Sequence, residues 1–87
     1  MPSLEPQSDA GNQEGLQSQL QTQEDEIKRR IDELHKNAGL STTERRTLKD
    51  ATSFWSQAAA ALQQHDLLRA RELAEKASLL VTALEHR

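Results

Sequence analysis

The chain of 87 residues contains no cysteine, which excludes disulfide bonds and thiolate metal sites. It has no tyrosine and only one tryptophan and one phenylalanine, so it is poor in the aromatic residues that favour strands. No run approaches the ~18 consecutive apolar residues of a membrane span. Leucine and alanine dominate the apolar residues, and glutamate, glutamine and arginine are frequent among the polar ones; all five are strong helix formers. We therefore predict a single all-α domain.

The charge is uneven along the chain. Residues 1–15 carry three acids and no base, so the other 72 residues hold 11 basic and 11 acidic side chains (14 minus 3). A neutral body gives no electrostatic reason to expect nucleic acid or an anionic membrane as a partner. Residues 1–15 also hold both prolines and few large apolar side chains, which predicts a disordered acidic tail. The start lacks the features of a signal peptide, so we expect a cytoplasmic protein, or a cell-envelope protein if a leader has been removed.

Apolar periodicity predicts three helices, over about residues 16–38, 42–64 and 66–85. The first has a narrow apolar stripe that Glu24 interrupts between Leu20 and Ile27. Three acid–base pairs with i,i+4 spacing are expected to stabilise it: Glu24–Lys28, Asp25–Arg29 and Glu26–Arg30.

The helix boundaries have local signals. Gly39 is expected to end the first helix in a left-handed conformation, with Leu40 folding back onto the core. Ser41 and Glu44 have the spacing of a capping box, which predicts the start of the second helix. Asp66 is the expected N-cap of the third helix.

Small residues are expected to form the interface between the second and third helices. Ala58 and Ala61 are predicted to face Ala70, Ala74 and Ala77, which allows a close approach of the two helices. The fold predicted is an up-down-up three-helix bundle. Docking of the first helix in the same chain is favoured, and the alternative is that it extends away and pairs with another chain as a coiled coil. The expected core anchors are Phe54, Trp55, Ile27, Ile31, Leu34, Leu62, Leu73 and Leu80.

The segment "HDLLRARELAEKASLL" resembles the second half of a tetratricopeptide repeat, with Asp66 at the turn acid and Ala70 and Ala77 seven residues apart. His65 stands where that family has a turn glycine, and no second repeat is visible, so the resemblance implies hairpin geometry only. Residues 41–87 also resemble the C-terminal region of uncharacterised bacterial proteins, often exported or lipoprotein-like, that carry the pattern "F…A…L…D-L-x-R-A-x-x-L-A-E-K-A". That resemblance implies no activity. The matching residues are Phe54, Leu62, Asp66, Leu67, Arg69, Ala70, Leu73, Ala74, Glu75, Lys76 and Ala77.

Chemical sites have weak signals. Asp32 and His35 lie one helical turn apart, but a metal needs more ligands, so no metal or cofactor is expected. No serine or histidine lies in a recognisable nucleophile motif, and a small filled bundle leaves little room for a ~300 Å³ pocket, so an enzyme is not expected. The basic side chains mostly have acidic neighbours, which argues against a nucleic-acid interface.

Two leucines on the third helix point away from its apolar stripe. Leu68 and Leu79 lie about three turns apart, with Glu72 and Glu75 between them. Isolated exposed leucines are common, and the alternative is a contact line for another helix, in this chain or a second copy. The predicted function is a non-catalytic structural or protein-interaction module, with a monomer favoured over a homodimer. The alternatives are a nucleic-acid-associated adapter, which salt-dependent DNA retention would reveal, and a metal-carrying bundle, which metal uptake would reveal.

Overall fold

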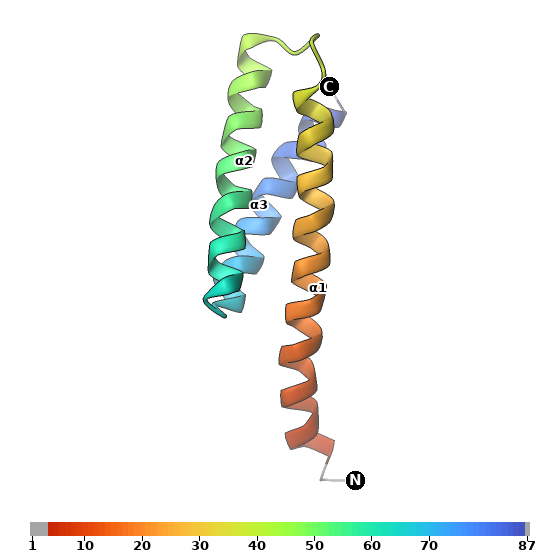
Figure 1. Ribbon diagram of the computed structural model, residues 1–87, viewed down its shortest axis with the longest axis vertical. Helices are drawn as coiled ribbons and strands as arrows, with labels where there is room; N and C mark the ends of the chain where they lie inside the picture. Colours follow the sequence, from red (N-terminus) through yellow and green to blue (C-terminus); the bar gives the residue numbers. More distant parts are fainter. Residues whose placement is uncertain (1–3, 87) are drawn as a thin grey trace.

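The computed structural model describes residues 4–86, with the side chains of residues 14–86. These residues form three helices, α1 (Leu4–His35), α2 (Thr42–Gln63) and α3 (Leu67–Glu85), and no strand. The helices run up, down and up (Figure 1). The most extensive packing joins α2 to α3, and α1 contacts both. The predicted three-helix bundle is thus confirmed, and α1 docks within its own chain.

The start of α1 differs from the prediction. The helix begins at Leu4, twelve residues before the predicted start at about residue 16. Residues 1–3 lie outside the described residues. The first turns of α1 project past the end of the α2–α3 hairpin (Figure 1). Extending an existing helix adds about one backbone hydrogen bond per residue without a new nucleation cost, which favours the longer helix.

The end of α1 also differs from the prediction. Gly39 has no positive φ, so the expected left-handed glycine cap is wrong. The last turn closes instead with short-range bonds from the Lys36 and Asn37 backbone N–H groups to the carbonyls three residues earlier. The Gly39 N–H donates to the Asn37 side chain at 2.8 Å, a local turn that starts the loop earlier than predicted. Leu40 is buried, as predicted.

The other helix boundaries follow the prediction. The Glu44 N–H donates to Ser41 Oγ at 3.1 Å and the Ser41 N–H donates to Glu44 Oε1 at 2.8 Å, which confirms the capping box. The Arg69 N–H donates to the Asp66 carboxylate at 3.3 Å, which confirms the N-cap of α3.

A left-handed helix cap lies at the end of α2, in the turn that joins α2 to α3. His65 has a φ of 61°. The Asp66 N–H donates to the Ala61 carbonyl at 2.9 Å and the His65 N–H donates to the Leu62 carbonyl at 3.0 Å. These are the two bonds of a Schellman motif, in which glycine is the preferred residue at the position of His65.

The core matches most of the expected anchors. All five alanines predicted for the α2–α3 interface are buried. The buried anchors are Ile27, Ile31, Leu34, Leu62 and Leu73. Phe54, Trp55 and Leu80 are only half-buried and pack against the edge of the core. Trp55 Nε1 donates to the Glu24 backbone carbonyl at 3.0 Å, a direct link between α2 and α1.

The ion pairs on α1 differ from those predicted. Lys28 pairs with Asp32 at 3.1 Å and Arg29 pairs with Glu26 at 2.6 Å. Arg30 binds Glu85 on α3 instead of an acid on α1. The three predicted pairs are therefore wrong. For two of the three pairs the reason is tertiary: Glu24 is buried in the bundle and Arg30 faces α3, so neither side chain is available on a solvated face of α1.

Candidate functional site: the α1/α3 groove and the outer stripe of α3

One side of α3 carries an exposed line of side chains that we call the outer stripe, made of Leu68, Glu72, Glu75 and Leu79. At ~100° per residue these four positions fall within an arc of about 60°, opposite the buried alanines of the same helix. Both leucines are 70% exposed. The predicted orientation of these leucines, away from the core, is therefore confirmed.

The carboxylates of the outer stripe are incompletely neutralised. Glu75 lies 3.8 Å from Arg71 Nε, and both side chains are more than half exposed, so this pair is loose. Among residues 14–86, no basic side chain lies within ion-pair distance of Glu72. Lys76, one turn further along α3, has its ammonium 5.6 Å from the centroid of the Phe54 ring on α2. That contact directs Lys76 toward α2 rather than toward Glu72.

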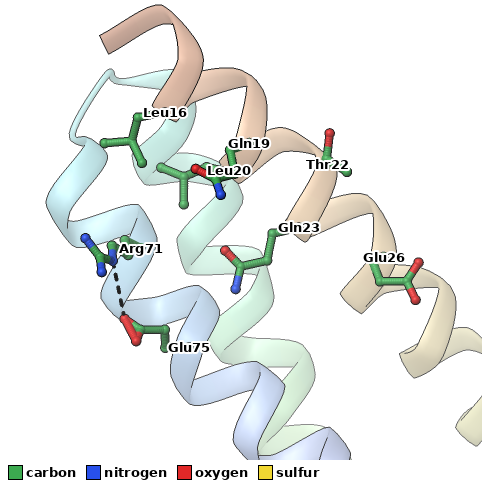
Figure 2. A pocket seen from close by; sticks show the side chains of 8 residues that line it. All are labelled: Leu16, Gln19, Leu20, Thr22, Gln23, Glu26, Arg71 and Glu75. Atoms are coloured by element: carbon green, nitrogen blue, oxygen red, sulfur yellow. Dashed lines mark ion pairs between the residues drawn. The ribbon is translucent and has the colours of Figure 1, made fainter. Parts of the chain in front are cut away.

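A surface groove lies beside the outer stripe, between α1 and α3. We call it the α1/α3 groove; it has a volume of about 720 Å³. Figure 2 shows α1 and α3 side by side, with Leu16 and Leu20 on the α1 side and Arg71 and Glu75 on the α3 side. The lining residues are Leu16, Gln19, Leu20, Thr22, Gln23, Glu26, Arg71 and Glu75. This groove does not contradict the expectation that a filled core leaves little room for a ~300 Å³ pocket, because it lies between two helices at the surface.

The groove and the outer stripe form one surface. A smaller hollow of about 190 Å³ is lined by Gln23, Glu75, Ser78 and Leu79. It shares Gln23 and Glu75 with the groove and reaches Leu79 of the stripe. An object placed across this surface would therefore contact α1 and α3 together.

A bidentate ion pair joins α1 to α3 further along both helices, beyond the residues that line the groove. Arg30 donates from Nε to Glu85 Oε2 at 3.0 Å and from Nη2 to Glu85 Oε1 at 2.5 Å. Nη2 also donates to Thr82 Oγ1 at 3.0 Å. The hydrogen bond to Arg30 lowers the pKa of Glu85, and the same bond raises the pKa of Arg30. This paired geometry is more specific than a single contact and sets the register of the two helices.

Glu24 is the unexpected residue of the α1 interface. Its side chain is 4% exposed, and its Oε2 atom has no hydrogen-bond partner among the described residues. Burial raises the pKa of Glu24, with a smaller contribution from the nearby charge of Asp25. The positions Leu20, Glu24, Ile27, Ile31 and Leu34 follow 4,3 spacing, so Glu24 occupies a core position of the heptad pattern. The interruption in the stripe was visible in the sequence, but its burial was not predicted.

The other candidate residues do not converge. Asp32 is bound by Lys28 rather than by His35. His65 lies in the α2–α3 turn and His86 caps α3. Within the described part of the chain, no three histidine, aspartate or glutamate side chains lie close enough to hold a metal ion.

No family model, curated protein or solved structure matches this chain. None of the helices, within the described residues, is long and apolar enough to cross a membrane. The groove residues Leu16, Gln19, Gln23 and Arg71 were not predicted as site residues. The only sequence signal for the groove is that Leu16 and Leu20 are the first two apolar residues of the predicted stripe of the first helix.

Proposed function

We propose that this chain is a non-catalytic helical module that binds another protein through the outer stripe and the α1/α3 groove. The observation that carries the proposal is the pair of leucines, each 70% exposed, aligned on the outer stripe. A single exposed leucine is ordinary. Two on one narrow arc flank the carboxylates of the outer stripe, and Glu75 also lines the groove of about 720 Å³ together with Leu16 and Leu20, so exposed apolar and charged groups lie on one surface. Such surfaces mark protein interaction sites.

We also propose that the free chain is a monomer. The apolar stripe of α1 is covered by α2 and α3 of the same chain, with Ile27 and Ile31 almost fully buried. The core therefore does not need a second copy to exclude water from α1. Sedimentation at micromolar concentration should give the mass of one chain, and a concentration-dependent dimer would contradict this part of the proposal.

Site-specific photo-crosslinking in the native host tests the interaction surface. A photoreactive amino acid replaces Leu79 in one variant and Gln57, which is exposed on α2, in a matched control. We expect one identified protein to crosslink from position 79 and not from position 57, and to be lost when Leu68→Ser is added. The same products from both positions, or crosslinking that survives Leu68→Ser, would contradict the proposal.

A further inference from the structure

The outer stripe has the spacing of a helix-pairing face. Leu68, Glu72, Glu75 and Leu79 are separated by four, three and four residues, the spacing with which one helix packs along another. At a rise of ~1.5 Å per residue, the two leucines lie about 16 Å apart along α3. The apolar contacts are therefore at the ends of the stripe and the carboxylates are at its centre.

A second copy of α3 is a poor match for this face. In an antiparallel pair of two α3 helices the leucines would meet at the ends, and the glutamates of the two copies would face each other at the centre. A parallel pair would also bring the same carboxylates together. Like charges facing each other across an interface are unfavourable, so the stripe disfavours self-pairing.

The charges instead match a basic helix. Glu72 has no ion-pair partner among the described residues, and Glu75 has only the loose contact with Arg71. Glu26, the third acid beside the groove, is already paired with Arg29 at 2.6 Å. Two carboxylates and one guanidinium leave a net charge of −1 between the leucines. A partner helix that places basic side chains there would pair with the free carboxylate and keep its apolar residues on the leucines.

We propose that the outer stripe and the α1/α3 groove bind a basic amphipathic helix of another protein, with apolar residues at positions i and i+11 and basic residues at i+4 and i+7. This inference rests on the proposed function and specifies the partner of the same surface. The helix lies along α3, its leucine-like residues contact Leu68 and Leu79, and its basic residues face Glu72 and Glu75. Its flank lies over Leu16 and Leu20 of α1.

Three synthetic stapled helices test the charge preference. Each has leucines at i and i+11, and the two central positions hold lysine, glutamine or glutamate. Titration of the full chain into labelled peptide, followed by fluorescence anisotropy, gives each Kd. We expect the lysine peptide to bind about tenfold more tightly than the glutamate peptide, with the glutamine peptide between them, because surface ion pairs each contribute a factor of a few. The difference should shrink at high salt.

Charge reversal separates a local effect from net charge. In Glu72→Lys/Glu75→Lys the order of the three peptides should invert. The matched control Glu33→Lys/Asp50→Lys changes the net charge equally at exposed positions on α1 and α2, and should keep the original order. Equal binding of all three peptides, or the same inversion in both double variants, would overturn the inference.

The leucine variant distinguishes failure of this inference from failure of the proposed function. Leu68→Ser/Leu79→Ser should weaken binding of the lysine peptide at least tenfold. A different result is that the glutamine or glutamate peptide binds the wild-type chain as tightly as the lysine peptide does, and that the double serine variant binds none of them. In that case the surface remains an interaction site, and the proposal of a basic partner is wrong. If the wild-type chain sediments as a dimer and the double serine variant as a monomer, the partner of this surface is a second copy of the chain rather than a basic helix.

Discussion

Replacing Glu24 by leucine is expected to stabilise the bundle, although it removes a charged residue. The side chain is 4% exposed and its Oε2 atom has no hydrogen-bond partner in the part of the chain that the structure describes, so the folded protein bears the desolvation cost of an unsatisfied carboxylate. Such a cost is about 1–3 kcal/mol, and replacing a buried charge by an apolar side chain of similar volume recovers it. We expect a gain of about 2 kcal/mol in the free energy of unfolding, which for a domain of this size raises Tm by roughly 10 °C.

The gain should depend on pH, with a sign that follows from the raised pKa of Glu24. The folded chain holds this proton more tightly than the unfolded chain, so between the ordinary pKa near 4.5 and the raised folded value the folded state binds more protons. The wild-type chain therefore loses stability from Glu24 as pH rises through that window, and the loss is complete above it. The gain in the free energy of unfolding, relative to the wild type, should be largest at neutral pH for both Glu24→Leu and Glu24→Gln, and smaller below pH ~4.

Chemical denaturation followed by Trp55 fluorescence at several pH values measures this difference. The pKa of Glu85 is lowered by Arg30, so that pair is lost as pH falls in every variant and cancels in the comparison. Glu33→Leu, an exposed position on the same helix, is the control and should change stability by less than about 0.5 kcal/mol. A loss of stability in Glu24→Leu, or a gain that is the same at pH 4 and pH 7, would refute the reasoning.

Three further predictions concern packing and turns. Ala74→Leu should destabilise the chain by ~1–3 kcal/mol in denaturant, because Ala74 is almost fully buried between α2 and α3; no loss would contradict the alanine interface. His65→Gly should stabilise it by about 1 kcal/mol, because glycine adopts the left-handed conformation of this turn without a Cβ penalty, whereas His65→Ala should give no such gain. Deletion of residues 1–15 should leave Tm nearly unchanged, because the first turns of α1 project past the hairpin; a large drop would show that they pack.

The features that depend on neighbouring residues were predictable from the sequence. The capping box of Ser41 and Glu44 needs only a spacing of three residues and a hydrophobic run after it, and it forms as predicted. The exposure of Leu68 and Leu79 follows from the helical repeat relative to the buried alanines. Each of these predictions uses the geometry of one helix, which the sequence determines without knowledge of the other helices.

The features that were predicted wrongly, or not at all, depend on how separate helices pack against one another. Gly39 was the better candidate for a left-handed cap, yet that conformation occurs at His65, where two backbone hydrogen bonds close the short turn between α2 and α3. In the sequence, Glu24 interrupts the apolar stripe and was predicted to pair with Lys28. In the structure, α1 packs against α2 and α3, and this packing buries Glu24. The groove needs the relative positions of α1 and α3, to which Arg30 and its cross-helix pair with Glu85 contribute. No single-helix pattern contains that information.

Glu24 and one wall of the α1/α3 groove both lie on α1, but their effects are separable. Leu16, Leu20 and Gln23 line the groove only while α1 lies against α3, so a bound partner would stabilise the docked form. An undocked population weakens apparent affinity by the fraction that is competent to bind. That fraction is close to one when undocking costs more than about 2 kcal/mol, so removing Glu24 then adds stability without changing Kd for the lysine peptide. Tighter binding of Glu24→Leu than of wild type would instead show that α1 leaves the bundle often enough to limit recognition.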